Sequence, residues 1–135
     1  MGTFLLQFDF SKAFDSISPS KLFIQLRDMV FSRTALLWIK SYLQDRQFQV
    51  VSKSSRSDVF GTNRGVPQGS VLCPLLFCLY INDLQSHLPM GVFHLPYADD
   101  LQVFIQAPPE GVNAAIATLK LIADKVSIWA NRVLL

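Results

Sequence analysis

The sequence predicts an α+β fold in which helices pack on one face of a small antiparallel sheet. Strand-like apolar segments near both ends of the chain are separated by segments with helical periodicity, in the order β, α, α, ββ, loop, α, ββ, α. The length of 135 residues suits one domain with a single core. No repeat or low-complexity tract interrupts this order, so we expect one domain over residues 1–135.

The first half of the chain predicts one strand followed by two helices. Residues 3–10 are rich in aromatic and aliphatic side chains and predict a buried strand that ends at Asp9. Ser18 is suited to cap a helix whose first position is Pro19. A second helix is expected to begin at Ser32. The apolar residues at helical spacing in these helices are Leu22, Phe23, Leu26, Met29 and Val30, then Leu36, Leu37, Ile39, Tyr42 and Leu43.

The middle of the chain predicts two short strands, a loop and a buried helix. Residues 47–52 and 58–62 are the strands, with a polar connection between them. The GVPQG segment at residues 65–69 breaks regular structure. A helix capped by Ser70 and running to about Leu84 is apolar on nearly all sides, which indicates burial.

The last third predicts a hairpin and one amphipathic helix. Residues 92–97 and 101–106 are strands that flank Ala98-Asp99-Asp100, so acidic residues stand at the tip of the hairpin. A helix over residues 112–129 closes the pattern. Its apolar face consists of Ile116, Leu119, Ile122, Ala123, Val126 and Trp129.

The composition leaves two explanations open. Half of the residues are hydrophobic and only 16% are charged, which is apolar for a free-standing domain. Either some apolar surface packs against a partner or another part of the same protein, or the core is large.

Basic residues concentrate between Lys21 and Arg64, which would suit binding to a polyanion. On charge alone, a solvated face is the preferred interpretation.

The cysteines and the apolar runs indicate an intracellular chain with no membrane partner. Cys73 and Cys78 lie in an apolar run without a metal-type cluster, as is typical of reduced core residues. The run at residues 71–81 is too short to cross a bilayer, which needs about 20 residues. No basic leader marks a signal peptide, and the chain opens at once into a strand, as if excised from a longer protein.

Three aspartates are the candidate chemical site. Asp99 and Asp100 stand side by side between two apolar runs, where burial of charge is costly, and Asp9 ends the first strand. If that strand lies beside the hairpin, the three carboxylates meet, and a divalent cation would relieve their repulsion. Oxygen ligands without His or thiolate suit Mg²⁺ or Mn²⁺, and a pair of such ions serves phosphoryl displacement. The alternative is that adjacent aspartates simply favour turns.

Several segments resemble one family of enzymes. Residues 8–15 (FDFSKAFD) resemble the first palm motif of reverse transcriptases, and residues 97–100 (YADD) resemble their YxDD signature. Residues 65–77 (GVPQGSVLCPLLF) with 80–84 (YINDL) are similar to the second palm motif of non-LTR, LINE-type retrotransposons. Residues 38–46 (WIKSYLQDR) resemble the segment between these motifs. The motifs keep the family order and cover nearly the whole chain, so it resembles a reverse transcriptase palm domain.

The resemblance implies a polymerase palm-like fold and a set of site residues. Asp9, Asp99 and Asp100 would form the catalytic, metal-binding triad, with Asp100 acting more indirectly and the Phe10 carbonyl as a further ligand. Two Mg²⁺ ions are the implied cofactors, with Mn²⁺ as the alternative. The residues implied to contact substrate are Ala13, Phe14, Gln68, Gly69 and Tyr97.

The implied substrate contacts each have a simpler interpretation. The Phe14 ring would clash with a 2′-hydroxyl and so select deoxynucleotides, but by residue type alone it is a core aromatic. Gln68 would contact the nucleotide or the template base from a loop whose glycines allow close backbone approach, or that loop is a plain turn. Tyr97 would pack against the primer or template, or it is a buried strand tyrosine. Asp15 and Asp83 are expected to cap or pair locally.

The resemblance implies an RNA-directed DNA polymerase that adds dNTPs to a primer 3′-hydroxyl on an RNA template. Residues 1–135 would be a partial domain, because most of the fingers and the thumb of a longer polyprotein lie outside it. Alone it should bind Mg²⁺ weakly and polymerise poorly, since phosphoryl transfer depends on positioning. The family also implies a nuclear step. The alternative is a non-catalytic retroelement remnant that serves as a structural or RNA-binding module.

Overall fold

The computed structural model describes residues 1–134, which divide into two compact units. Unit 1 combines Met1–Ala13 with the chain from Ile81 onward, whereas unit 2 is the continuous segment Phe14–Tyr80. Both units contain helices together with small antiparallel sheets, so the α+β class is confirmed. No helix among the described residues is both long enough and apolar enough to cross a membrane.

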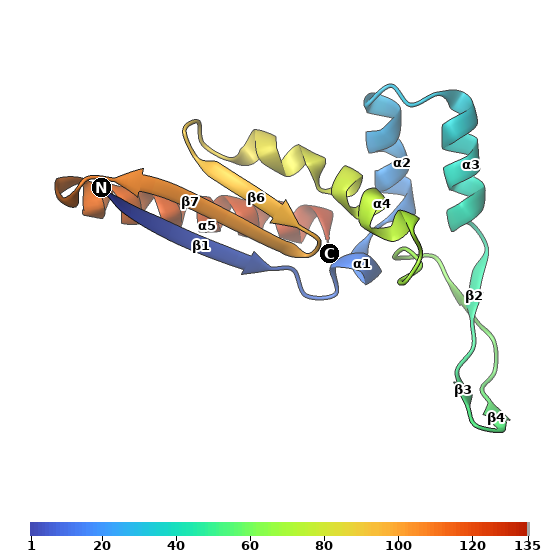
Figure 1. The fold of residues 1–135 in the computed structure, drawn as a ribbon. Coiled ribbons are helices and arrows are strands. Elements are labelled where there is room, and N and C mark those ends of the chain that lie inside the picture. The colour runs from blue at the N-terminus through green and yellow to red at the C-terminus, as the bar shows by residue number, and fades with distance from the viewer. Residues whose placement is uncertain (135) are drawn as a thin grey trace. The chain divides into compact units, whose positions relative to one another are not determined.

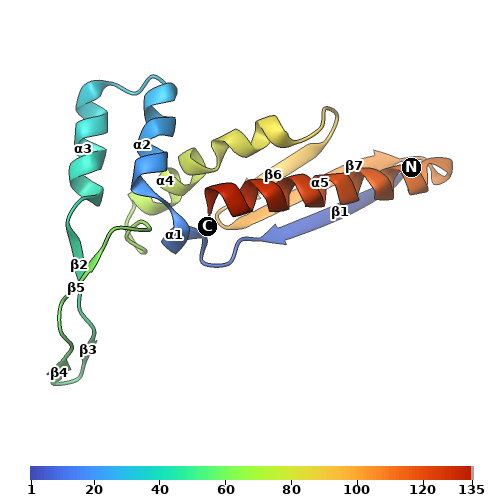
Figure 2. The same ribbon diagram turned by 180° about the vertical axis from the view of Figure 1, so that it is seen from behind.

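Unit 1 is a three-stranded antiparallel sheet with a long helix on one face (Figure 1). The strand order is β1 (Gly2–Asp9), β7 (Asp100–Ala107), β6 (Phe93–Tyr97). Helix α5 (Val112–Val133) covers one face of the sheet and runs along the strands, as the reverse view shows (Figure 2). Two short 3₁₀ segments complete the unit, η1 (Asn82–His87) and η2 (Pro109–Gly111).

Alternation along β7 decides which face of the sheet is covered. Leu101, Val103, Ile105 and Ala107 are buried on the side of α5, whereas the residues between them are half-buried or exposed. Strand β1 follows the same alternation, with Leu5 58% exposed. The prediction of a buried first strand is therefore wrong for one of its faces, because α5 covers a single side of the sheet.

Helix α5 differs from its prediction in length and in one core position. It continues to Val133, four residues past the predicted end at Trp129. Ile116 was expected in the core but is 42% exposed, and the neighbouring Ala115 is buried instead, against Ile105 and Ala107. A small side chain fits there because the helix runs close to the end of β7.

Unit 2 begins within α1 (Ala13–Ser16) and continues into α2 (Pro19–Asp28) and α3 (Arg33–Leu43). The predicted cap at Ser18 is confirmed, because its hydroxyl accepts from the Lys21 amide at 3.5 Å. The helix expected to begin at Ser32 begins at Arg33, and the Ser32 hydroxyl caps it by accepting from the Ala35 amide at 3.2 Å. The short α1 was not predicted. A four-residue helix carries too few apolar repeats to be recognised by periodicity.

The two predicted strands of the middle region are four shorter ones, which together form the arm of unit 2. Strand β2 (Arg46–Phe48) pairs with β5 (Phe60–Thr62), and β3 (Val51–Ser52) pairs with β4 (Ser55–Arg56). The expected polar connection thus contains a strand of its own. Large apolar side chains remain exposed along the arm, namely Phe48, Val50, Val51, Val59 and Phe60.

Helix α4 (Leu72–Tyr80) ends earlier than predicted and is buried on one side only. Cys73, Leu76, Phe77 and Tyr80 are buried, but Leu75 is 54% exposed and Cys78 is exposed. Cys73 is therefore a core residue as predicted, and the same prediction for Cys78 is wrong. The chain after Tyr80 turns into η1 rather than continuing the helix.

Candidate active site

Strand pairing in unit 1 brings the predicted acidic residues to one edge of the sheet. Asp9, the last residue of β1, is the direct partner of Asp100, the first residue of β7. Tyr97, the last residue of β6, is the partner of Asp100 on the other side. Directly opposed side chains of an antiparallel pair project to the same face, with Cβ atoms about 5 Å apart. The expectation that the first strand lies beside the hairpin is confirmed.

The hairpin tip is tied to the end of β1 through the backbone. Ala98 and Asp99 form the two-residue connection between β6 and β7, and Ala98 has a positive φ of 51°. The amide of Phe10 donates a hydrogen bond to the Asp99 carbonyl at 3.0 Å. Asp99 is therefore held next to the Asp9–Asp100 pair, although it lies outside the strand ladder.

The side chain of Phe10 is packed in the core, which fixes the position of the residue. Its carbonyl oxygen can still accept a further hydrogen bond or bind a metal ion. The ring is 7% exposed and packs on Trp129 of α5, with ring centroids 5.8 Å apart. The Phe10 carbonyl accepts one hydrogen bond, from the Ala13 amide at 3.2 Å. A carbonyl oxygen has two lone pairs, so one remains for a further partner.

The acidic edge lies on the side of the sheet that α5 does not cover. Leu101 is buried against α5, so its neighbour Asp100 projects to the opposite face, together with Asp9 and Tyr97. Asp9 is exposed, Asp99 and Asp100 are half-buried, and Tyr97 is 78% exposed. The alternative of a buried strand tyrosine at residue 97 is wrong, and the phenol is open to solvent.

The donor set at this edge is that of a hard divalent cation. It offers carboxylate oxygens from two facing strands and a backbone carbonyl, with no His or thiolate. Among residues 1–134, the side chains of His, Cys, Asp and Glu form no group of three or more that could hold a metal ion. The fit therefore rests on donor chemistry and backbone register.

In unit 2, the glycine loop at residues 65–69 is held against α1. Gly65 has φ 71°, and a Cβ there would lie 2.9 Å from the Phe14 carbonyl oxygen. Its amide donates to the Ile17 carbonyl at 2.7 Å, and the Val66 amide donates to the Phe14 carbonyl at 3.0 Å. Gly65 thus allows two segments of the chain itself to approach closely, and the expected approach of this loop to a nucleotide or template base stays a prediction. Gly69 has φ 82° with open space around it, so only its backbone conformation favours glycine there.

The side chains that the resemblance assigns to substrate have protein contacts of their own. The Gln68 amide donates to the Asp15 carboxylate at 2.9 Å, so Asp15 pairs within the protein, but with a residue distant in the sequence rather than with a local one as expected. The half-buried Phe14 ring packs on Phe77 with centroids 4.9 Å apart, as a core aromatic would. Ala13 is 2% exposed.

Burial, and secondly the charge of Asp15, raises the pKa of the Cys73 thiol above its ordinary value of 9.0. A thiol whose pKa is raised in this way stays protonated at neutral pH, so it is a weak nucleophile and a poor metal ligand.

The model of the family described as reverse transcriptase (RNA-dependent DNA polymerase) matches residues 1–132. The chain belongs to the reverse transcriptase family. It is 32% identical over 138 aligned residues to an RNA-directed DNA polymerase from the mobile element jockey of Drosophila melanogaster. That match covers 97% of this chain and 14% of the relative.

Two further relatives of this reverse transcriptase domain also come from mobile elements of flies. The probable RNA-directed DNA polymerase from transposon X-element of Drosophila melanogaster is 39% identical over 97 residues, covering 70% of this chain and 10% of the relative. A retrovirus-related Pol polyprotein from the type-1 retrotransposable element R1 of Bradysia coprophila is 35% identical over 133 residues, covering 95% and 12%. The resemblance found in the motifs is thus confirmed, and the chain spans about one seventh or less of these relatives.

Sequence reasoning missed the role of Arg46 in this reverse transcriptase domain. Its guanidinium donates to the carbonyls of Arg64 at 2.7 Å and Gly65 at 2.6 Å, which fastens the glycine loop to the base of the arm. The other basic residues between Lys21 and Arg64 are exposed, in line with a solvated face. Arg46 lies within the WIKSYLQDR segment, but no sequence signal identifies backbone carbonyls as its partners.

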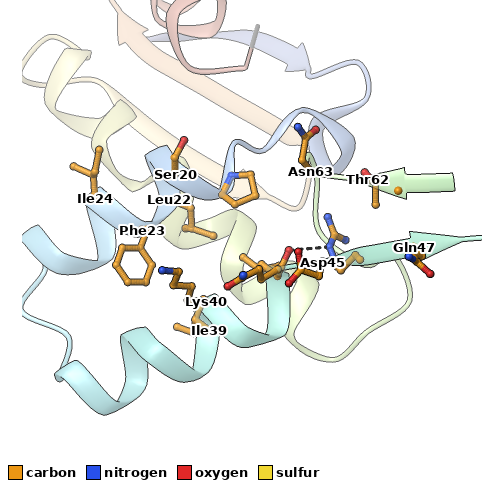
Figure 3. Close-up of a pocket in the computed structure, with 15 residues that line it drawn as sticks. Ser20, Leu22, Phe23, Ile24, Ile39, Lys40, Asp45, Gln47, Thr62 and Asn63 are labelled. Carbon is orange, nitrogen blue, oxygen red and sulfur yellow. Dashed lines mark hydrogen bonds between the residues drawn. The ribbon is translucent and has the colours of Figure 1, made fainter.

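Unit 2 also holds an open cavity of about 910 Å³ that the sequence did not predict (Figure 3). Leu22, Phe23 and Ile39 of α2 and α3 line its apolar side, and Thr62 and Asn63 line the side next to the arm. Its lining contains one carboxylate, Asp45, and therefore no metal-type cluster. Residues from four elements line the cavity. The periodicity of a single element does not predict how several elements come together, so nothing in the sequence indicated it.

Proposed function

We propose that the chain is the palm-like core of an RNA-directed DNA polymerase that joins a dNTP to a primer 3′-hydroxyl on an RNA template. The observation that carries this proposal is the register that pairs Asp9 with Asp100, joined by the hydrogen bond from the Phe10 amide to the Asp99 carbonyl. Together they bring the three carboxylates of the family motifs to one open edge of the sheet. Membership of the reverse transcriptase family supports the same activity.

In this proposal Asp9 and Asp99 are the main ligands of two divalent ions, and Asp100 acts more indirectly. The remaining lone pair of the Phe10 carbonyl is a further ligand, held in place by the packing of the ring on Trp129. When bound, Mg²⁺, or Mn²⁺ in its place, lowers the pKa of the primer hydroxyl and stabilises the leaving pyrophosphate. The protein supplies orientation, because the β1–β7 ladder fixes where the carboxylates stand.

The substrate contacts are proposed from the same motifs. Tyr97 offers an exposed ring on the face that carries the carboxylates, which suits packing against the primer or template. Phe14 would exclude a 2′-hydroxyl by its bulk, with its position maintained by Phe77. Gln68 would exchange its bond to Asp15 for a nucleotide or template base, with Gly69 allowing close approach. Ala13 would act through its backbone, since its side chain is buried.

The proposal assigns the remaining parts of catalysis to the longer polyprotein. Because the chain covers 14% of the jockey relative, we propose that fingers and thumb segments outside it hold the triphosphate and the duplex. The isolated chain should therefore bind ions weakly and polymerise poorly. We also propose an intracellular protein with a nuclear step, on family grounds alone.

The decisive experiment measures Mn²⁺ binding to this chain by electron paramagnetic resonance. We expect Asp9→Asn and Asp99→Asn each to weaken binding by about tenfold or more, because each removes a charged ligand. Asp124→Asn is the matched control, since Asp124 is an exposed carboxylate on α5 of the same unit. Equal Mn²⁺ affinity in all three variants would overturn the metal site.

Activity is tested in a chain extended by fingers and thumb segments. There Asp99→Ala should abolish synthesis on a primed RNA template, and Asp124→Ala should leave it unchanged. Synthesis that survives Asp99→Ala would favour the non-catalytic remnant instead.

A further inference from the structure

Two residues of the WIKSYLQDR segment at residues 38–46 bind the two ends of the glycine loop. Tyr42 lies in the last turn of α3, and Arg46 is the first residue of β2 (Figure 1). Between them the helix ends at Leu43, and a positive φ of 53° at Asp45 marks the turn from α3 into the arm. Two side chains four residues apart therefore reach opposite ends of one loop.

Arg46 binds the start of the glycine loop through a charged donor. Its Nη2 donates to the carbonyls of Arg64 at 2.7 Å and Gly65 at 2.6 Å. Its Nε donates to the Leu43 carbonyl at 3.4 Å, which connects the same guanidinium to the end of α3. A planar guanidinium can bridge the carbonyls of two segments in this way, whereas the ammonium of lysine is a point charge on a flexible stem. The fork of Arg46 thus fixes where the loop begins relative to α3.

Tyr42 binds the residue that directly follows the glycine loop. Its hydroxyl donates to the Ser70 hydroxyl at 2.7 Å, and its ring stacks on Trp38 with centroids 5.7 Å apart and planes inclined by 3°. The Ser70 hydroxyl also accepts from the amide of Cys73, in the first turn of α4, at 3.2 Å. The Tyr42 hydroxyl therefore fixes where the loop ends and α4 begins.

The tip of the glycine loop is open while its ends are bound. Gln68 and Gly69 are exposed, and open space surrounds Gly69. The Gln68 amide donates to the exposed Asp15 carboxylate at 2.9 Å, a contact that a ligand can replace. Hydrogen bonds at both ends of a loop limit the conformations of its tip, so less conformational entropy is lost when the tip binds a ligand. This is the geometry of a preorganised binding loop.

We propose that Tyr42 and Arg46 are positioning residues that hold the two ends of the glycine loop, so that Gln68 is presented to the incoming nucleotide or to the template base. The inference rests on the proposed function, which assigns Gln68 and Gly69 to substrate binding. Neither positioning residue touches the substrate, and each acts through the loop. The WIKSYLQDR segment thereby acquires a role in the reaction.

Steady-state primer extension by the chain extended with fingers and thumb segments tests this role. Tyr42→Phe removes one hydroxyl and keeps the ring on Trp38, and Arg46→Lys keeps the charge without the fork. We expect each variant to raise the KM for the dNTP by about three- to tenfold, as for a lost hydrogen bond, and to change kcat by less than about twofold. Gln68→Ala should raise the KM at least as much.

Two control substitutions lie at the opposite end of α3. Ser32→Ala removes the hydroxyl that caps the helix, and Arg33→Lys makes the same exchange as Arg46→Lys at an exposed position. Both controls should keep the KM within about twofold, although loss of the cap destabilises α3. An equal rise of the KM in Ser32→Ala would show that any loss of helix stability has this effect, and it would overturn the inference. Circular dichroism shows which variants fold, and Tyr42→Phe, which removes a single oxygen atom, decides if Arg46→Lys does not.

Double variants separate positioning from general stability. If Tyr42 and Arg46 act through Gln68, Tyr42→Phe/Gln68→Ala and Arg46→Lys/Gln68→Ala should have the same KM as Gln68→Ala alone. A further rise of the KM in the double variants would show that the two residues act independently of Gln68. Single variants with the KM of Arg33→Lys would show that neither residue supports nucleotide binding. Either result overturns the inference.

The same assay distinguishes failure of this inference from failure of the proposed function. Synthesis that survives Asp99→Ala counts against the polymerase site and overturns both. Synthesis that depends on Asp99, together with an unchanged KM in Gln68→Ala, removes Gln68 from substrate binding and the positioning role with it. Synthesis that depends on Asp99 and Gln68, but not on Tyr42 or Arg46, leaves the proposed function standing and overturns the positioning role alone.

Discussion

At the scale of single residues, the turn that carries Asp99 holds an unfavourable backbone conformation. Ala98 has φ 51°, a region that costs a residue with a Cβ about 1–2 kcal/mol. Two-residue hairpin connections usually place glycine or asparagine at such positions. The conformation is maintained by the Tyr97–Asp100 pair on one side and the Phe10–Asp99 hydrogen bond on the other. Strain that the surroundings impose in this way is a common property of functional turns.

Replacing Ala98 by glycine should therefore stabilise the protein. We expect Ala98→Gly to raise the free energy of unfolding by about 0.5–1 kcal/mol, because relief of the positive φ outweighs the added entropy of the unfolded chain. Urea denaturation followed by circular dichroism measures the change. The control is Ala117→Gly in the exposed middle of α5, where the same substitution should cost about 1 kcal/mol. Destabilisation at both positions would show that the turn is unstrained.

The sequence predicted this hairpin and its acidic tip but not its strain. Alternating apolar residues around Ala98-Asp99-Asp100 indicated two strands with a three-residue tip. In the structure Asp100 belongs to β7, because Asp9 and Tyr97 both pair with it. That partnership is set by the neighbouring strands, so no local pattern reveals that only two residues remain for the turn.

At the scale of elements, helix α5 is anchored to η1 by a buried indole. Trp129 is 1% exposed, and its Nε1–H donates to the Asp83 carboxylate at 3.0 Å. Arg132 reinforces the join, since its Nη2 lies 3.9 Å from the other Asp83 oxygen and donates to His87 Nε2 at 3.0 Å. Asp83 thus pairs with other protein groups, but its partners are distant in the sequence rather than local as expected. Periodicity placed Trp129 on the apolar face, but it could not identify an acceptor 46 residues away.

Removing the Asp83 carboxylate should destabilise unit 1 strongly. We expect Asp83→Ala to lower the free energy of unfolding by about 1–3 kcal/mol, because the buried indole N–H loses its acceptor. The exposed Asp124 supplies the control, and Asp124→Ala should stay within about 0.5 kcal/mol of the unsubstituted chain. Denaturation monitored by tryptophan fluorescence gives both values. A loss in Asp83→Ala no larger than in the control would mean that the hydrogen bond carries no stability.

At the scale of the whole molecule, the acidic edge depends on pairing between opposite ends of the chain. Strand β1 pairs with β7 along its full length, from Gly2 with Ala107 to Asp9 with Asp100. The sequence predicted both strands, but it did not determine whether they lie side by side. Local periodicity does not encode which distant strand becomes the pairing partner. The resemblance of the motifs to those of reverse transcriptases implies the same arrangement. The division into two units likewise has no signal in composition or linkers.

Because β1 and β7 belong to the same unit, a break in unit 2 should leave the acidic edge assembled. The weakest backbone of unit 2 is the end of its arm, where β3 and β4 have two residues each and Lys53 has φ 51°. We expect trypsin to cut first after Lys53 or Arg56, although the chain has 12 Lys and Arg residues. The fragments should co-elute in native size-exclusion chromatography and keep amide protection in β1 and β7.

The variant Lys53→Gln/Arg56→Gln should be cut about tenfold more slowly, which identifies the arm as the site of cleavage. Mass spectrometry of the first products locates the cut. A first cut at Lys120 or Lys125 in α5 would place the least stable backbone in unit 1 instead. Separation of the fragments after a cut in the arm would show that the β1–β7 ladder needs the continuous chain of unit 2, and the acidic edge would then not be a property of unit 1 alone.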